Sequence, residues 1–160
     1  MSSNEIPFGY KFDGQKGEIV AEEKEMKLVN TIFDLFTEYN INQMEITDLL
    51  NGFTTIKDII IFRIEKICET AQFYNKDLLK EFDNVDIDNI LTNKEEIDKK
   101  IITPLLNNKD GIKNLDTTMN DIILKQIDDV ILLINKQEEI ENKYGDFTQL
   151  KKNNTTDLER

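Results

Sequence analysis

The sequence has no histidine and no tryptophan, one cysteine and two prolines among its 160 residues. Without histidine, the chain lacks the side chain that most often acts as a general base or binds a metal near neutral pH. The one cysteine, Cys68, excludes an intramolecular disulfide and a zinc site built from several cysteines. Because Cys68 stands in an apolar helical pattern, we expect a small buried side chain and no reactive thiol.

Long apolar runs are absent as well. No stretch reaches the length of a membrane span, and the start of the chain has no apolar segment of the kind found in secretion signals. We therefore expect a cytoplasmic protein with no membrane partner. The excess of Ile, Asn, Lys, Asp and Glu is typical of AT-rich coding, as in many low-GC bacteria and their phages.

Positive charge is scarce. The chain has 20 Lys and Arg against 32 Asp and Glu, a net charge of −12, and its pI is about 4.5. Residues 1–75 hold 7 basic and 13 acidic side chains, and residues 76–160 hold 13 and 19, so no basic half is hidden. Phosphate backbones and anionic lipids are therefore poor expected partners.

The abundant carboxylates do not form a recognisable chemical motif. Asp83, Asp86 and Asp88 lack the spacing and the closing glutamate of a calcium loop, and the NNKDG stretch at residues 107–111 fails the same test. Gly14 and Gly17 are not followed by the Lys-Ser/Thr pair of a phosphate-binding loop. We predict no enzyme, no catalytic residue, no metal and no cofactor.

The first half of the chain predicts a short hairpin followed by helices. Residues 8–20 alternate loosely around a glycine turn, and we expect their aromatic side chains to pack on the first helix. That helix should run from about Glu22 to Tyr39. A second should begin at a capping box of Asn42 and Glu45 and end at Gly52, and a third should run from Thr55 to Phe73. The first helix carries a wide apolar stripe, expected to be core: Met26, Val29, Ile32, Phe33, Phe36 and Tyr39.

The second half predicts a linker near residues 83–89, a helix interrupted at Pro104, a turn at 107–111 and a long amphipathic helix from about Thr118 to Tyr144. On this helix Ile123, Ile127, Val130 and Ile134 have the 4-3-4 spacing of a coiled-coil seam, so they are a candidate face for a partner within the chain or in an oligomer. The predicted fold is mainly α, with an N-terminal hairpin, a helix-turn-helix-like three-helix unit and a C-terminal helical unit. The predicted divisions are residues 1–75, 76–150 and a flexible tail at 151–160.

An ordered series of short motifs marks residues 6–53: IPFGY at 6–10, a glycine turn, EIV at 18–20, VNTIF at 29–33 and ITDLLNG at 46–52. This series resembles the recombinase domain that follows the catalytic resolvase domain in large serine recombinases, with a weaker echo as far as residue 75. The resemblance implies a hairpin, a helix-turn-helix-like pair and DNA binding. Residues 76–160 have no counterpart in it.

The sequence also departs from that family. It has no catalytic serine domain, no tryptophan at the start of the next helix and no zinc-ribbon cysteines. Lys57, Arg63 and Lys66 are the candidate nucleic-acid contacts of the recognition helix, but Asp58, Glu65 and Glu69 nearly cancel their charge.

Three classes of function follow. The residues favour a non-catalytic protein-interaction or regulatory protein of a bacterium, phage or mobile element, with an acidic surface that binds a basic or nucleic-acid-binding protein. The alternative is an orphan recombinase-type domain that binds DNA in site-specific recombination. An enzyme is the least favoured class.

Overall fold

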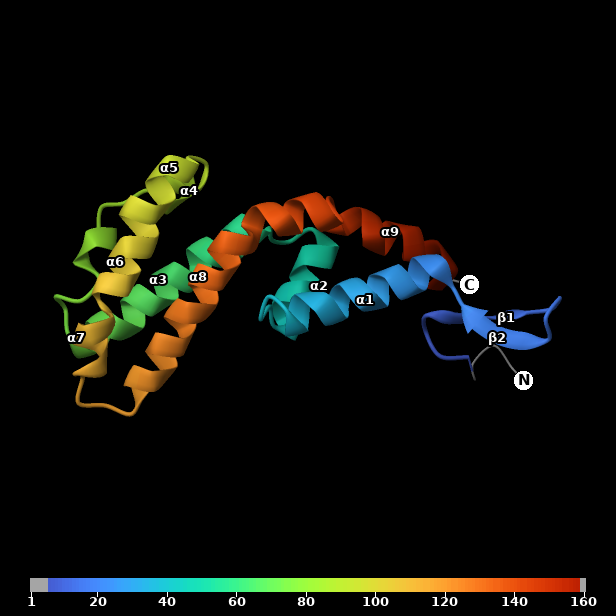
Figure 1. Ribbon diagram of the computed structural model, residues 1–160, viewed down its shortest axis with the longest axis horizontal. Helices are drawn as coiled ribbons and strands as arrows, with labels where there is room; N and C mark the ends of the chain where they lie inside the picture. Colours follow the sequence, from blue (N-terminus) through green and yellow to red (C-terminus); the bar gives the residue numbers. More distant parts are fainter. Residues whose placement is uncertain (1–5, 159–160) are drawn as a thin grey trace. The chain divides into compact units, whose positions relative to one another are not determined.

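The computed structural model describes the backbone of residues 6–158 and the side chains of residues 6–152, and Figure 1 shows helices preceded by one short hairpin. This confirms the predicted mainly α fold. In chain order the elements are β1 (Tyr10–Asp13), β2 (Glu18–Ala21), α1 (Glu23–Thr37), α2 (Gln43–Asn51), α3 (Ile56–Tyr74), η2 (Lys80–Phe82), α4 (Ile87–Leu91), α5 (Lys94–Ile97), η3 (Asp98–Ile102), α6 (Thr103–Asn107), α7 (Lys109–Lys113), α8 (Met119–Tyr144) and α9 (Phe147–Leu158).

The chain forms two compact units. Unit 1 takes its described residues from the ranges Met1–Thr54 and Glu139–Arg160, and unit 2 is Thr55–Glu138. The sequence predicted boundaries near residues 75 and 150. The structure instead divides the chain just before α3 and within α8, because α9 packs against α1 and α2 rather than extending the second half.

The hairpin in unit 1 has the predicted antiparallel pairing, with Tyr10 opposite Ala21 and Phe12 opposite Ile19. Cross-strand partners lie on the same face of a hairpin, so Tyr10, Phe12 and Ile19 share one side. That side faces solvent, with Phe12 57 % exposed. The expectation that these side chains pack on the first helix is therefore wrong.

The contact with α1 is made by the chain just before the hairpin. Gly9 has a φ of +100°, and a Cβ there would lie 3.3 Å from the Met26 side chain. Its carbonyl accepts a hydrogen bond from the Glu22 N–H at 2.9 Å. Only glycine combines this backbone conformation with so close an approach, which explains the IPFG entry.

Helix α1 buries a different face from the one expected. Its N-cap is Glu22, whose carboxylate accepts a hydrogen bond from the Glu25 N–H. Its buried residues are Leu28, Thr31 and Leu35. The apolar arc of α1 is wider than one packing interface, so part of the predicted core stripe faces outward.

Helix α2 follows its sequence signals closely. Asn42 and Glu45 form the reciprocal capping box, and Gly52 ends the helix with a φ of +76°. A Cβ on Gly52 would lie 3.0 Å from the Thr148 side chain at the start of α9. Gly52 therefore both ends α2 and allows α9 to approach it.

Unit 2 is built around α3, which has buried residues along most of its length and follows the predicted bounds closely. Thr55 caps it by accepting a hydrogen bond from the Asp58 N–H. Its buried side chains are Ile56, Ile59, Ile60, Ile64, Ile67 and Ala71.

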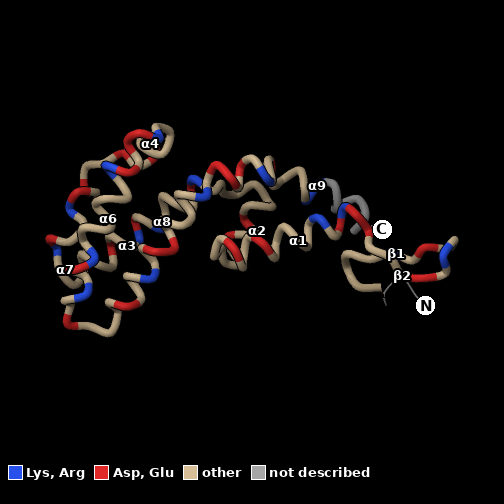
Figure 2. The backbone as a smooth tube through the Cα atoms, in the orientation of Figure 1, with Lys and Arg blue, Asp and Glu red and all other residues tan. Residues whose placement is uncertain are grey.

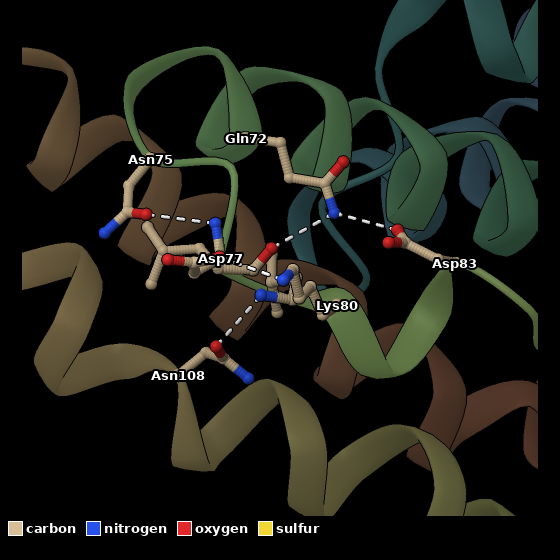
Figure 3. Close-up of polar contacts among 8 residues, drawn as sticks. Gln72, Asn75, Asp77, Lys80, Asp83 and Asn108 are labelled. Carbon is tan, nitrogen blue, oxygen red and sulfur yellow. Dashed lines mark hydrogen bonds and ion pairs between the residues drawn. The ribbon is translucent and has the colours of Figure 1, made fainter.

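The segment after α3 is held by two polar side chains (Figure 3). Leu79 is fully buried and has a φ of +57°, which is uncommon for a residue with a branched side chain. Its N–H donates to Asn108 Oδ1 at 3.0 Å, and Gln72 Nε2 donates to the Leu78 carbonyl at 3.1 Å. Asn108 Nδ2 donates in turn to the Pro104 carbonyl. The chain just before the predicted linker is therefore an anchored turn, and the linker predicted near residues 83–89 is shorter than expected because α4 begins at Ile87.

The predicted break at Pro104 and the predicted turn at 107–111 are both built into helical structure. The chain passes from α5 through the π-helical turn η3 into α6, where Pro104 occupies the first turn and needs no N–H donor. Gly111 lies within α7, and a Cβ there would lie 2.7 Å from Leu78 Cδ2. Close packing on Leu78 explains this glycine.

Helix α8 confirms the predicted long helix and begins in unit 2. In unit 2 it forms ion pairs with Lys109 of α7 through Asp128, and with Lys94 of α5 through Glu138. Beyond Gly145, α9 continues to Leu158, where the sequence predicted a flexible tail from residue 151. The last two residues of that tail lie outside the described residues.

Candidate functional site

The candidate nucleic-acid contacts lie on α3. Lys57 forms an ion pair with Asp88 of α4. Lys66 lies 3.5 Å from Glu69 and 5.7 Å from the centre of the Phe62 ring. Figure 2 shows acidic and basic positions interleaved along the chain. Pairing with carboxylates reduces the positive potential that these two lysines could offer to phosphates. DNA binding through Lys57, Arg63 and Lys66 stays a prediction.

The three aspartates that the sequence singled out have separate structural partners. Asp83 accepts a hydrogen bond from Gln72 at 3.0 Å, Asp86 caps α4, and Asp88 pairs with Lys57. Among the described residues, no group of three or more Cys, Asp or Glu side chains is arranged to hold a metal ion.

The candidate oligomer face of α8 is part of the core of unit 2. Ile123, Ile127 and Val130 have no exposed surface, and Ile134 is 6 % exposed. The 4-3-4 spacing left open whether this face packs within the chain or against another subunit. In the structure, the face packs within the chain. An oligomer seam would require unit 2 to open.

Cys68 is partly buried on α3 and has no activating neighbour. Burial, together with the negative charges of Asp83 and Glu81, raises the pKa of its thiol to about 12. A thiol with this pKa is almost entirely protonated at neutral pH, so it is a poor nucleophile and a poor metal ligand.

In unit 1, a cluster of three titratable side chains links the end of α8 to α1. Tyr144 donates to Asp34 at 3.4 Å, and Lys143 lies 3.7 Å from the same carboxylate. Burial raises the pKa of the Tyr144 phenol. The protonated phenol of Tyr144 and the ammonium of Lys143 both contact the Asp34 carboxylate. This contact holds the two helices together and activates none of the three groups for catalysis.

Unit 2 contains a polar depression of about 710 Å³ beside α4 and α6. Its charged lining residues carry both signs, and one pair is neutralised within α5–η3 because Lys100 lies 3.1 Å from Glu96. No charge of one sign converges on it, so we assign it no ligand. It is lined by Glu81, Asn84, Val85, Asp86, Asn89, Ile90, Thr92, Asn93, Glu96, Lys99, Lys100 and Pro104.

Unit 1 contains an apolar groove of about 480 Å³, which we call the α1–α2 groove. Each helix contributes a row of four residues with the spacing i, i+3, i+4, i+7, and none of the eight is charged. The α1 row is Val29, Ile32, Phe33 and Phe36, and the α2 row is Gln43, Ile46, Thr47 and Leu50.

The α1 side of this groove carries two aromatic side chains that are open to solvent. Phe33 is 64 % exposed and Phe36 is 59 % exposed, whereas Ile46, which lines the same groove from α2, is only 4 % exposed. Exposed aromatic side chains beside a pocket are typical of protein-binding surfaces. The sequence placed Phe33 and Phe36 in the core. The signal that could have found them is the width of the apolar stripe, because Leu28 and Leu35 already supply a buried face seven residues apart.

The helices that carry the groove are strongly acidic. Residues 22–52 contain seven Asp and Glu and two Lys, a net charge of −5. The groove therefore lies in a negative field that favours a positively charged partner.

No described helix is long and apolar enough to cross a membrane.

Compared with protein-family models, curated proteins and solved structures, the chain shows no match in any of the three. The resemblance of residues 6–53 to the recombinase domain of large serine recombinases therefore stays a prediction. The α1–α2 groove is the candidate functional site of the chain.

Proposed function

We propose that the chain is a non-catalytic interaction or regulatory protein of a bacterium, phage or mobile element, and that it binds a basic, nucleic-acid-binding protein. The observation that carries this proposal is the α1–α2 groove, which combines exposed Phe33 and Phe36 with a local charge of −5. Apolar anchors supply affinity, and complementary charge supplies a fast and selective encounter.

The overall charge supports the same class of partner. At −12 the chain repels nucleic acids and attracts the basic proteins that bind them. An acidic protein of this kind would compete with DNA for its partner, which gives it a regulatory effect without catalysis. The recombinase-like motifs are consistent with a role in a mobile element.

Retention of basic proteins from a nuclease-treated lysate of a low-GC bacterium tests this proposal. The immobilised chain should retain a basic protein that elutes as salt is raised, and an unrelated protein of equal size and charge should not. The nuclease removes nucleic acid that could bridge two proteins. Equal retention by the control protein would refute the proposal.

Binding to duplex DNA is the competing outcome. We expect no shift of a duplex probe at low salt, because the cations of α3 are balanced by carboxylates. A shift whose affinity falls steeply with salt would instead establish the recombinase-type DNA-binding function.

A further inference from the structure

We propose that the α1–α2 groove binds an amphipathic, positively charged helix of another protein. This inference rests on the proposed function and specifies its site and the form of the partner. Its basis is the pairing of two uncharged rows with identical spacing on adjacent helices, the α1 row wholly apolar and the α2 row half apolar, inside an acidic segment.

The geometry of the rows favours a helix as the occupant. The rows from Val29 to Phe36 on α1 and from Gln43 to Leu50 on α2 each cover eight residues, or about 10 Å along a helix axis. Two helices that pack together leave a groove between them, and a third helix fits such a groove through its own i, i+3, i+4, i+7 ridge. An occupant would therefore place three or four apolar side chains over two turns.

The same pair of helices already accepts a third helix within the chain. α9 packs against both α1 and α2, and the buried residues of the pair include Leu35 and Leu49. The groove uses other residues of α1, and its two phenylalanines are exposed. The pair thus has apolar residues that the chain covers and apolar residues that it leaves open.

Charge determines the polar face of the occupant. All eight lining residues are uncharged, so a charge buried at the groove floor would have no partner there. The segment that contains both helices, residues 22–52, carries a net charge of −5. A helix with leucine-like anchors toward the groove and Lys or Arg along its outer sides satisfies both conditions.

A designed peptide is the direct probe. It has about four helical turns, Leu at i, i+3, i+4 and i+7, Lys and Arg on the other faces, and one Trp on the apolar face. Because the chain has no tryptophan, the fluorescence of that Trp reports the peptide alone. A peptide of the same composition in scrambled order, and one with Glu in place of Lys and Arg, serve as controls.

We expect the basic amphipathic peptide to bind with a blue shift of its Trp emission, and the two control peptides to bind far more weakly. Phe33→Ser with Phe36→Ser should weaken binding by about 30-fold, the value expected when two anchors of a small interface are lost. Phe62→Ser is the matched control, because Phe62 on α3 is 58 % exposed, and it should change binding less than about twofold.

A second variant keeps the experiment decisive if the double substitution disturbs α1. Thr47→Arg leaves every apolar side chain in place but fills the groove with a long cation that repels the peptide. Thr70→Arg on α3 is its matched control, because both threonines donate to the carbonyl four residues earlier. Circular dichroism of all four variants checks that the helices are retained.

The inference is overturned if the groove variants bind the peptide as the wild type does, or if the scrambled peptide binds equally well. It is also overturned if the wild type is a dimer that Phe33→Ser with Phe36→Ser dissociates, because the occupant is then a second copy of the chain. Retention of a basic protein without peptide binding would overturn the groove inference and leave the proposed function standing. If the chain neither retains a basic protein nor binds the peptide, both the proposed function and the groove inference are refuted.

Discussion

Unit 2 uses its apolar residues internally, whereas unit 1 leaves a large share of them exposed. Among the described side chains, unit 2 buries 20 apolar residues and unit 1 buries nine. Unit 1 nevertheless has more large apolar side chains in solvent, eight against five, and they include Phe33 and Phe36 of the α1–α2 groove. An isoleucine-rich core accounts for the composition of unit 2, and it does not account for the aromatic surface of unit 1.

The difference separates residues that maintain the fold from residues available for binding. Substitutions in the core of unit 2 should lower stability and leave binding untouched in the folded chain. Substitutions in the groove should do the reverse. The following predictions test this division, from the largest expected change in stability to the smallest.

Ile127→Ala removes a fully buried side chain from the α8 seam. We expect the free energy of unfolding to fall by about 3 kcal/mol, because the lost transfer energy is increased by the cavity left behind. Urea denaturation measures this change. Ile122→Ala, at a position on the same helix that is 49 % exposed, should cost much less. A stable Ile127→Ala variant with an altered oligomeric state would show that the seam binds another subunit after all.

Asn108→Ala tests the anchored turn of unit 2. The substitution leaves the N–H of fully buried Leu79 without its acceptor and removes the donor to Pro104. An unsatisfied buried amide costs about 2 kcal/mol, which urea denaturation would detect. Asn84→Ala, at an exposed position in the neighbouring loop, is the control. An equal loss in both variants would mean that Asn108 does not anchor Leu79.

Gly111→Ala tests the packing of α7 on Leu78. A Cβ 2.7 Å from Leu78 Cδ2 forces one group to move, and this overpacking exceeds the gain in helix propensity. We expect a net loss of about 1 kcal/mol in the free energy of unfolding. In a Leu78→Ala background the clash disappears, so the same substitution should become stabilising. Gly14→Ala, where a Cβ meets nothing within 4 Å, checks for a general effect.

The helix ends that the sequence predicted are those set by local hydrogen bonds. The Asn42–Glu45 capping box, the Gly52 stop and the Thr55 cap each involve groups within four residues of one another, so a short stretch of sequence specifies them. The end of the chain illustrates the opposite case. Residues 147–158 have a weakly apolar pattern, and α9 is stabilised by packing against α1 and α2, which no local pattern reveals.

The candidate site was missed for a related reason. Helical periodicity shows which residues share a face, and it does not show whether that face is covered. Phe33 and Phe36 follow the same spacing as a core stripe, and only the folded structure reveals that they are left open. The charge of residues 22–52, by contrast, was readable from the sequence and gives the groove its expected selectivity.

Phe33→Ser with Phe36→Ser is predicted to have the smallest effect on stability, and it most directly tests the contrast between the units. Both rings are more than half exposed, so little apolar surface returns to water on unfolding, and serine and phenylalanine have similar helix propensities. The free energy of unfolding should change by less than about 0.5 kcal/mol by urea denaturation. A loss comparable to that of Ile127→Ala would mean that the two rings pack within unit 1 and belong to its core. If the stability is unchanged, the two rings do not maintain the fold, and the proposed partner would then supply the burial that unit 1 lacks.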